Sequence, residues 1–463
     1  MPKNKGLSII IVGCGKVGVT LVEQLSREGH DITVIDKNRS LVDHMTGTYD
    51  VMGVVGNGAS YSTQREAGIE KADIIIAVTD SDELNLLCCT VAKRFAGCSA
   101  IARVRTPDYS DDIAYLRERL GLAMIFNPEL ECAREAARML SLPTALEVAS
   151  FAHGQAELVT FKIPKNNRLD GMKLWDMSKS IPADIETNVV ICAVERGDQV
   201  YIPSGNFQLQ CGDEVSFVST RKIAQKFLRS IGFKTRQVRS TMIIGGGRSA
   251  YYLAQELLGM GIQVKLIEKN RKRCEELCEL LPDASIINGD GTSEDLLREE
   301  GIEYAESLVA LTGIDEENIL LTLHARNVSS AKVVTKINRI NFRNAINSLD
   351  LGSVLYPKYI TAEAIVAYVR SKHNSMHSNV ETLNYICNNR VEAVEFQVND
   401  ASDVTGVMLK DLKPRMKKDI LIASINRNGR VLIPSGVDTI EAGDSVMVVT
   451  THSGFNDIRD ILA

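Results

Sequence analysis

The chain carries one sequence plan twice, and each copy opens with a glycine-rich loop between an apolar segment and an amphipathic one. The first loop is Gly-Cys-Gly-Lys-Val-Gly at 13–18, and the second is Gly-Gly-Gly-Arg-Ser-Ala at 245–250. An acidic residue follows each loop at the end of the next apolar segment, Asp36 and Glu268, at the same spacing in both copies. This duplication predicts two strand-loop-helix units that each bind a nucleotide. In an ordinary dehydrogenase, by contrast, the second half of the chain forms a substrate-binding domain.

The repeat continues well beyond the glycines. Each further match follows an apolar segment, where a doubly wound α/β unit places the end of a strand. The offset between matching residues drifts between 231 and 235 along the whole repeat, which small loop insertions explain. The matches are 56–59 with 289–292, 77–85 with 310–318, and 102–105 with 335–338. We therefore expect two copies of one Rossmann-like α/β unit built on a parallel sheet.

A second module, with strand and turn chemistry, follows each α/β unit. Segment 171–177 matches segment 406–412. Predicted strands then enter tight turns at 196–198 and 427–429, and the latter contains Asn-Gly, a strong hairpin signal. Ile-Pro-Ser-Gly and Gly-Asp-Glu/Ser-Val motifs complete both copies. The order is A-B-A-B, with a small α+β subdomain after each α/β unit.

The predicted boundaries follow from these matches. A proline opens a helical segment between A and B in each copy, at Pro128 and Pro357, as suits a first helical turn. Such a crossover helix either covers its own sheet or packs against its equivalent in a partner. The predicted parts are a first α/β domain at 1–126, a crossover helix at 127–142, a β-rich subdomain at 143–232, a second α/β domain at 238–355, a crossover helix and linker at 356–379, and a second β-rich subdomain at 380–463.

Composition narrows the class of protein. The chain has 463 residues, enough for two to four domains of roughly 100 to 200 residues. Its 44% hydrophobic and 24% charged content is that of a globular protein. A net charge of −6 offers no cationic excess for nucleic acid. We expect no signal peptide and no membrane-spanning segment, because the longest apolar runs are too short. Ten cysteines without a C-x-x-C pair indicate reduced cytosolic thiols and no metal site.

The first glycine loop has the context that dinucleotide binding requires. Its first glycine permits the tight turn, the second lets the backbone approach a pyrophosphate, and the third lets helix and strand pack closely. The helix N-terminus then offers amides and a partial positive charge. Asp36, at the end of the next strand, would accept hydrogen bonds from ribose hydroxyls and repel a 2′-phosphate, which favours NAD over NADP. The alternative role for Asp36 is that of a solvated strand end or helix cap.

Further polar residues follow the next strands and should line the same crevice at the carboxyl edge of the sheet. These are Asn57, Thr79 and Asp80, with loop and cap chemistry as the alternative. Arg103 follows a further strand and is either a pyrophosphate partner or a surface residue. Lys16 and Arg248 occupy one position in the two loops, where a cation would reach a terminal phosphate unless it is merely solvated.

The second copy departs from the first. Ala250 replaces the third glycine, Glu268 is longer than Asp36, and Gly313 and Lys336 stand where Asp80 and Arg103 do. The second pocket therefore has a different wall, and we expect it to hold a different nucleotide or none.

Hydride-transfer chemistry has less support. It would need a substrate pocket with a general acid, commonly histidine, and an orienting cation. None of the seven histidines stands at repeat-equivalent positions, and we expect His30 in a surface turn before the second strand. The sequence has no nucleophile elbow, Walker loop or zinc spacing. An NAD-dependent oxidoreductase remains the alternative function, with a stand-alone nucleotide or redox sensor behind it, although no helix-turn-helix or basic stretch accompanies the repeats.

The A-B-A-B order resembles the TrkA family of potassium-uptake regulatory proteins, and the features that carry this resemblance are the glycine loop at 13–18, Asp36, the segments at 77–85 and 102–105, and the Pro-Ser-Gly and Gly-Asp-Glu-Val motifs. The resemblance covers nearly the whole length. It implies tandem RCK, or KTN, domains, each with a C-terminal subdomain. It further implies a non-enzymatic cytoplasmic protein, peripheral on the inner face of the cell membrane and forming a homo-oligomer, a dimer or tetramer, without nucleic acid.

On this resemblance the partner is a membrane Trk-type potassium channel or transporter subunit, gated according to bound NAD(H) and ATP or ADP. The candidate cofactor-binding residues of the first copy are Gly13, Cys14, Gly15, Lys16, Val17, Asp36, Asn57, Thr79, Asp80 and Arg103. Those of the second copy are Gly245, Gly246, Gly247, Arg248, Ser249 and Glu268. No catalytic or metal-binding residue is expected.

Overall fold

The structure is a computed structural model that describes residues 6–110, 113–177, 181–182, 185, 188–233, 235–338, 349, 351–373, 379–387, 389–399 and 402–463. Part of the predicted linker, 374–378, therefore lies outside the described residues. The chain divides into two compact units. Unit 1 comprises Met1–Ala133, Gly247–Tyr252 and Tyr356–Val369, and unit 2 comprises Arg134–Gly246, Leu253–Leu355 and Arg370–Ala463.

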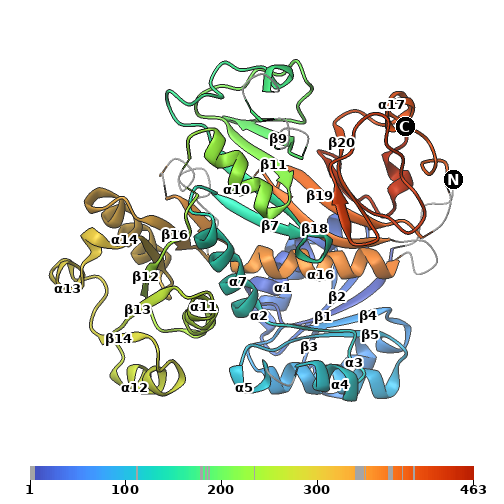
Figure 1. The fold of residues 1–463 in the computed structure, drawn as a ribbon. Coiled ribbons are helices and arrows are strands. Elements are labelled where there is room, and N and C mark those ends of the chain that lie inside the picture. The colour runs from blue at the N-terminus through green and yellow to red at the C-terminus, as the bar shows by residue number, and fades with distance from the viewer. Residues whose placement is uncertain are drawn as a thin grey trace. The chain divides into compact units, whose positions relative to one another are not determined.

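Unit 1 is built on a parallel sheet of strand order β3-β2-β1-β4-β5-β6 (Figure 1). Its strands are β1 (Ser8–Val12), β2 (Asp31–Asp36), β3 (Met52–Val55), β4 (Ile74–Ala77), β5 (Ser99–Arg103) and β6 (Met124–Phe126). Every residue of β4 is buried, which explains its unbroken apolar sequence. The strand order changes direction at β1, and a parallel sheet binds its ligand in the crevice at such a switch point.

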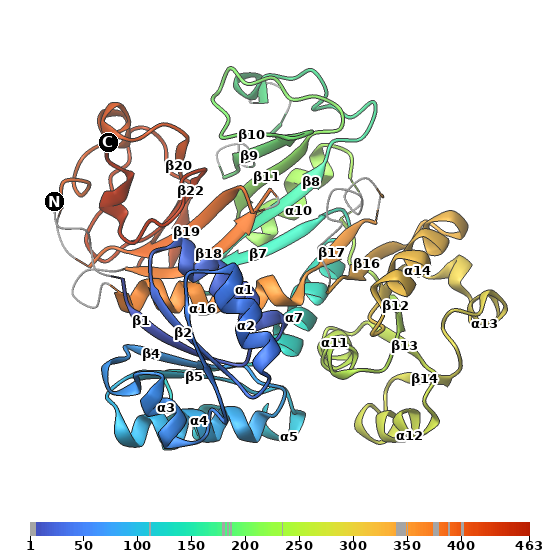
Figure 2. The ribbon, with the colours of Figure 1, turned by 180° about the vertical axis from the view of Figure 1, so that it is seen from behind.

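Helices cover both faces of this sheet. Figures 1 and 2 show α1 and α2 on one face and α3 and α4 on the other. The helices are α1 (Lys16–Arg27), α2 (Arg39–Thr48), α3 (Tyr61–Glu66), η1 (Ile69–Lys71), α4 (Asp82–Phe95), α5 (Pro107–Ser110), α6 (Ile113–Arg119) and α7 (Pro128–Ser141). Proline stands first in α7, as predicted. His30 lies in the expected turn before β2, but the expectation that it is exposed was wrong, because its Nδ1 accepts the Leu7 N–H and only 8% of the residue is exposed.

The second parallel sheet lies in unit 2, and its order β14-β13-β12-β15-β16-β17 repeats that of the first. Its strands are β12 (Ser240–Ile244), β13 (Gln263–Glu268), β14 (Ser285–Asn288), β15 (Ser307–Ala310), β16 (Lys332–Lys336) and β17 (Ser353–Leu355). The helices of this copy are α11 (Arg248–Gly259), α12 (Arg271–Leu280), α13 (Glu294–Glu299), η4 (Ile302–Tyr304), α14 (Asp315–Val328) and α16 (Pro357–His373). Identical strand order confirms the predicted duplication.

Unit 2 also contains two antiparallel sheets, β10-β9-β11-β8-β7 and β18-β19-β22-β20-β21. The first comprises β7 (Glu147–Phe151), β8 (Ala156–Lys162), β9 (Val190–Arg196), β10 (Gln199–Tyr201) and β11 (Glu214–Ser219), with η2 (Ala152–Gly154), η3 (Leu174–Asp176) and α10 (Arg221–Ser230). The second comprises β18 (Val380–Ile386), β19 (Val391–Gln397), β20 (Ile420–Arg427), β21 (Arg430–Leu432) and β22 (Ser445–Thr450), with α17 (Leu409–Leu412), η5 (Lys413–Arg415) and η6 (Ile458–Ile461). The predicted fold class, Rossmann-like sheets each followed by an antiparallel sheet, is thereby confirmed.

Both predicted hairpin turns are present. Arg196 pairs with Gln199 across the first turn, and Arg427 pairs with Arg430 across the second. Asn428 and Gly429 adopt positive φ angles of 52° and 78°, the conformation that makes Asn-Gly favourable there.

An Arg-Asp pair fixes each hairpin to the next strand. Arg196 Nε and Nη2 each donate to the Asp213 carboxylate at 2.7 Å. Arg427 repeats this with Asp444 at 2.8 Å. Both carboxylates are 1% exposed. The aspartate of each Gly-Asp-Glu/Ser-Val motif therefore has a structural role.

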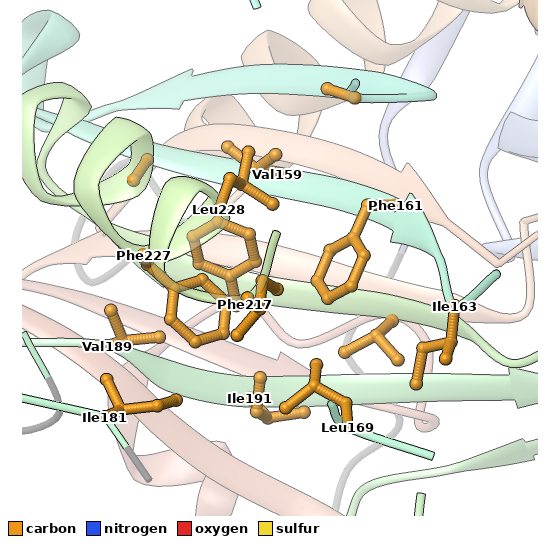
Figure 3. Packing of buried hydrophobic residues seen from close by; sticks show 14 of the residues in the cluster. Val159, Phe161, Ile163, Leu169, Ile181, Val189, Ile191, Phe217, Phe227 and Leu228 are labelled. Atoms are coloured by element: carbon orange, nitrogen blue, oxygen red, sulfur yellow. The ribbon is translucent and has the colours of Figure 1, made fainter. Parts of the chain in front are cut away.

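An aromatic core fills the space between the first antiparallel sheet and α10. Phe161, Phe217 and Phe227 lie edge to face in it, with Leu169 and Ile191 nearby (Figure 3). The Phe217 and Phe227 ring centroids are 4.9 Å apart. The amphipathic helix α10 supplies Phe227 and so closes this sheet on one side.

A half-buried lysine joins β16 to the segment before β7. Lys332 Nζ donates to the Ala145 carbonyl and to Ser353 Oγ, the latter at 2.8 Å. Ser353 Oγ also donates to the Leu146 carbonyl at 2.6 Å. Burial, and next the charge of Arg326, lower the pKa of Lys332 to about 7.

Two features are absent from the described residues. In that part of the chain, no helix is both long enough and apolar enough to cross a membrane. The same residues contain no group of three or more His, Cys, Asp or Glu side chains placed to hold a metal ion.

Candidate nucleotide site

The first glycine loop joins β1 to α1, and each of its glycines has a separate steric reason. Gly13 has a φ of +108°, and a Cβ there would lie 3.0 Å from the Thr79 amide nitrogen. A Cβ on Gly18 would lie 2.0 Å from the Gly13 carbonyl oxygen. Gly15 is extended, and nothing lies within 4 Å of its Cβ position. The first and third glycines are thus needed for the fold, whereas the Cβ position of the second faces open space.

Asp36 holds this loop in place from the end of β2. One carboxylate oxygen accepts the Cys14 N–H at 2.7 Å, and the other accepts the Asn38 N–H at 2.9 Å. Each oxygen keeps a further lone pair for another donor. Asp36 is half-buried, so an additional hydrogen bond from a ligand hydroxyl would form in a partly desolvated setting.

Cys14 does not supply a reactive thiolate. Burial, and next the Asp36 carboxylate, raise the pKa of Cys14 to about 12. Only 3% of the residue is exposed. The thiol therefore stays protonated at neutral pH and acts as a small apolar group under the loop.

The opposite wall of the crevice is held by a residue that sequence reasoning missed. Asn85, on α4 and fully buried, accepts the Thr79 N–H at 2.8 Å and the Thr79 hydroxyl at 2.7 Å. Its amide donates to the Thr79 and Arg103 carbonyls at 3.1 and 2.9 Å. Asn85 thereby ties the carboxyl ends of β4 and β5 together. Asn318 bonds in the same way to the Thr312 N–H and to the Thr312 and Lys336 carbonyls in the second copy, so the shared asparagine was the available signal.

Asp82 provides a second clamp on this wall and was also missed. It is 4% exposed and accepts the Arg105 and Thr106 N–H groups at 2.9 and 2.8 Å and the Thr106 hydroxyl at 2.7 Å. Burial alone would raise the pKa of Asp82, but these hydrogen bonds and the Arg105 charge outweigh it and lower the pKa. The carboxylate therefore stays ionised and orders the chain after β5.

Arg103 is buried in the wall, where the sequence left a surface role open. Its Nη2 donates to the Thr79 carbonyl at 2.5 Å and to the Asp80 carboxylate at 3.3 Å. Arg103 Nε is buried without a hydrogen-bond partner among the described residues. Burial, and next the charge of Arg105, lower the pKa of Arg103. Because Asp80 is fully exposed, this ion pair stabilises little and leaves the guanidinium able to exchange partners.

The remaining predicted residues of the first copy lie at the rim. Lys16 is exposed in the first position of α1, and Val17 follows half-buried. Asn57 is exposed and accepts the Ala59 N–H at 3.1 Å, which closes its own turn. The structure therefore places Asp36 and the glycine loop in one hydrogen-bond network. Thr79, Asp80 and Arg103 lie in a second network around Asn85, and Lys16 and Asn57 lie outside both.

The second copy repeats the loop and the acid. Gly245 has a φ of +97°, and its N–H donates to the Ile267 carbonyl at 2.8 Å. Glu268 accepts the Gly246 and Asn270 N–H groups, both at 2.7 Å. The rest of the loop leads into α11 with Gly247, Arg248 and Ser249. Ala250 is fully buried where the first copy has its third glycine.

The walls of the second copy differ as the sequence predicted. Arg273 Nε donates to the Gly246 carbonyl at 2.8 Å and places a guanidinium beside the loop, where the first copy has Leu41. Lys336 Nζ donates to the Leu311 carbonyl at 3.0 Å. Gly313 leaves the position of Asp80 without a side chain. A ligand here would meet different charges from those in the first crevice.

One residue of α11 reaches the wall of the first crevice within unit 1. The Tyr252 hydroxyl donates to the Arg105 carbonyl at 3.1 Å and accepts a hydrogen bond from Asn127 Nδ2 at 3.0 Å. Glu129 lies close by, and burial raises its pKa against the opposing charges of Arg105, Arg103 and Arg248. The start of the second copy's first helix is thus in contact with the first copy.

Known families match both parts of each copy. The TrkA-N domain model matches residues 9–128 and 241–357, and the TrkA-C domain model matches 158–232 and 393–463. The chain belongs to the TrkA family. The resemblance found in the sequence is therefore confirmed, and the matched segments fall on the parallel and antiparallel sheets in alternation.

Two relatives of this TrkA-family chain are similar to it in sequence over almost its whole length. A protein of Archaeoglobus fulgidus named Trk system potassium uptake protein TrkA homolog is 31% identical over 98% of this chain and 100% of its own. Trk system potassium uptake protein TrkA of Halomonas elongata is also 31% identical, over 98% of each chain.

Solved structures share the fold. The GsuK RCK domain superposes with a TM-score of 0.62 at 18% identity, covering 97% of this chain and 93% of that one. The GsuK channel bound to NAD gives 0.62 at 19% identity, covering 97% and 78%. These likenesses establish the RCK-type fold of the TrkA-family chain.

Proposed function

We propose that the chain is a regulatory subunit that binds NAD(H) and ATP or ADP and thereby gates a membrane Trk-type potassium channel or transporter. The observation that carries this proposal is the first crevice. There Asp36 holds the glycine loop, Gly15 faces open space, and the wall residues are fixed by buried polar side chains. The names of the relatives, which are potassium uptake proteins, supply the transport context.

In the first crevice we assign the pyrophosphate of NAD(H) to the amides of the loop and of the first turn of α1. The helix terminus and its partial positive charge favour an anion there. The Asp36 carboxylate would accept the ribose hydroxyls of the adenosine half. Arg103, which donates to a carbonyl and to an exposed carboxylate, would turn one N–H toward the phosphates.

The second crevice is assigned to an adenine nucleotide of different charge, ATP or ADP. Glu268 repeats the hydrogen bond of Asp36 to the loop, so the ribose end is conserved between the copies. Arg273 adds a cation where the first copy has Leu41, and Gly313 removes the carboxylate that the first copy has in Asp80. This difference in charge suits a ligand with terminal phosphates, such as ATP or ADP, better than the pyrophosphate that joins the two halves of NAD.

Gating would follow from unequal affinity for two arrangements of the modules. A ligand shifts such an equilibrium only through its differential affinity, and about 1.4 kcal/mol changes the populations tenfold. Making or breaking a single charge-assisted hydrogen bond, worth about 1.5 to 3 kcal/mol, is sufficient on that scale. Exchange of NAD for NADH, or of ADP for ATP, changes the ligand's charge by one unit and so supplies such a difference.

The assembly proposed with this function is a peripheral one. The chain would act as a homo-oligomer, a dimer or tetramer, on the inner face of the cell membrane beneath the Trk-type subunit. The four modules with boundaries at 1–126, 143–232, 238–355 and 380–463 are its proposed building blocks.

The binding proposal is tested by calorimetry on the purified full chain. Wild type should bind NADH, and Asp36→Ala should lose at least ten-fold in NADH affinity, because both the ribose contact and the Cys14 anchor are removed. Glu268→Ala is the matched control and should leave NADH affinity within two-fold. Equal NADH affinity in wild type and Asp36→Ala would remove the ribose assignment, and steady oxidation of NADH by an added carbonyl substrate would contradict the non-enzymatic role.

A further inference from the structure

The two antiparallel sheets of unit 2 share one buried core. We call β7 to β11 the first β module and β18 to β22 the second β module. Both contribute to a single cluster of buried apolar side chains, so the two sheets bury these faces against each other. From the first module come Phe151, Leu158, Cys192 and Val218, and from the second come Ile386, Val391, Ala423 and Val449.

The two modules present the same backbone feature to this interface. Ala152 and Cys387 occupy matching positions, each directly after the first strand of its module, β7 or β18. Their φ angles are 50° and 51°, in the left-handed region that residues other than glycine rarely adopt. Both belong to the shared cluster. The apolar part of the interface is therefore nearly symmetric and by itself does not distinguish one module from the other.

The polar part of the interface is not symmetric. Arg390, directly before β19, forms an ion pair with Glu195, the penultimate residue of β9, and its Nη1 donates to the Asp198 carbonyl at 2.5 Å. The matching positions are those of Gln155, directly before β8, and Asn426, the penultimate residue of β20. Asn426 Oδ1 is buried without a hydrogen-bond partner among the described residues. One end of the interface is thus charged and paired, and the other is neutral and incompletely paired.

A buried carboxylate adds to the difference. Glu395 of β19 is 3% exposed and accepts the Ala152 N–H with both oxygens, at 2.9 and 3.1 Å. Glu395 also accepts the Ser445 hydroxyl of its own sheet at 2.6 Å. Its equivalent in the first module, Thr160, hydrogen bonds to Ser216 of its own sheet at 2.8 Å. Of these two matching residues, only the one in the second module sends a charged side chain into the other module.

These faces can pair in three ways: a first module with a second module, two first modules, or two second modules. A first module facing a second module places Arg390 against Glu195. Two first modules would place Glu195 against Gln155, and two second modules would place Arg390 against Asn426 and bury Glu395 twice. The Glu195 side chain is only 11% exposed, so leaving its carboxylate without a cation is costly and disfavours the pairing of two first modules. In the pairing of two second modules, Arg390, which is 36% exposed, would lose its anion, so the unlike pairing keeps both charges paired.

We propose that Glu195, Arg390 and Glu395 are specificity determinants that make the first β module the required partner of the second. Apolar contacts supply the association, and the three charged side chains restrict it to unlike modules. The tandem duplication thereby gives a chain whose two copies pair with each other rather than each with its own kind in a second chain.

The contact is tested by zero-length carbodiimide crosslinking of the full chain carrying Arg390→Lys, which keeps the positive charge. We expect an amide crosslink between position 390 and Glu195, found by mass spectrometry in the band of monomer mass. Lys265 with Glu300, at 2.9 Å, and Lys162 with Glu214, at 3.3 Å, are internal positive controls. Crosslinking of these two pairs with none between position 390 and Glu195, or of position 390 only to the second module of another chain, would overturn the proposal.

Charge reversal tests the specificity. In the full chain, Glu195→Lys and Arg390→Glu should each raise hydrogen exchange in β7, β8, β18 and β19 at least ten-fold, because like charges then face each other. The double variant restores opposite charges and should return exchange to within three-fold of wild type. Gln155→Ala, at the neutral end, is the matched control and should change exchange less than three-fold. Single variants that behave like this control, or a double variant no better than the singles, would contradict the proposal.

Discussion

The sharpest test of the first crevice is a single methyl group on Gly15. This glycine has φ −74° and ψ −173°, which alanine adopts without strain, and nothing lies within 4 Å of its Cβ position. Gly15→Ala should therefore fold normally and even gain about 0.4 to 1 kcal/mol from the stiffer unfolded chain. The same methyl group occupies the space in which a pyrophosphate must approach the loop.

The expected loss follows from the hydrogen bonds that this approach allows. Charge-assisted hydrogen bonds are worth about 1.5 to 3 kcal/mol each, so displacing the phosphates from one loop amide should weaken binding by roughly 10- to 100-fold. Calorimetric titration with NADH measures this loss, and thermal unfolding of the same samples measures stability.

Two other glycines calibrate the result. Gly247→Ala, which also meets nothing within 4 Å, should leave NADH affinity unchanged because it lies in the second copy. Gly13→Ala should instead destabilise the fold, since φ is +108° and the Cβ would lie 3.0 Å from the Thr79 nitrogen. A Gly15→Ala chain that binds NADH as tightly as wild type would refute the placement of the pyrophosphate.

Three further predictions concern buried polar groups. Asn85→Ala should cost about 3 kcal/mol and increase hydrogen exchange at the ends of β4 and β5, because a buried backbone N–H and two carbonyls lose their partner; unchanged exchange there would count against the clamp. Lys332 has a pKa lowered from 10.5 to about 7, so the unfolded chain binds more protons between these values and stability should rise with pH across that window, by at most about 1.4 kcal/mol per pH unit. Lys332→Met should flatten that rise in thermal unfolding measured from pH 7 to 9.5, and an unaltered slope would show that another group titrates. Asp213→Asn and Asp444→Asn should each lower the stability of their own module by about 2 kcal/mol in urea unfolding, and a loss in only one module would break the structural equivalence of the pairs.

Most of the fold followed from local patterns in the sequence. The glycine loops, the acids at the ends of β2 and β13, and the Asn-Gly turn are set by backbone sterics and hydrogen bonds within a few residues. The duplication then implies that the two parallel sheets share one strand order, as they do. The crossover helices α7 and α16 begin at their prolines for the same local reason.

The supporting polar network did not follow in the same way. Asn85 and Asp82 stood in a motif that sequence reasoning matched between the copies, but their partners lie at the end of β5, 18 to 24 residues away. The sequence was equally consistent with Arg103 as a surface residue, because its burial depends on how the strands and helices pack. Pairing of Arg390 with Glu195 spans 195 residues and depends on how the two β modules meet. Such contacts are set by tertiary packing, which local propensity does not encode.

We propose that nucleotide bound by this chain controls potassium flow through a membrane subunit. Potassium flux through a Trk-type subunit reconstituted in vesicles, measured with the full chain and with or without NADH, tests it most directly. We predict that the wild-type chain makes the flux depend on NADH and that the Gly15→Ala chain binds the vesicles equally well without conferring that dependence. Flux that is the same with and without the chain, or that responds equally to NADH with either chain, would contradict the account.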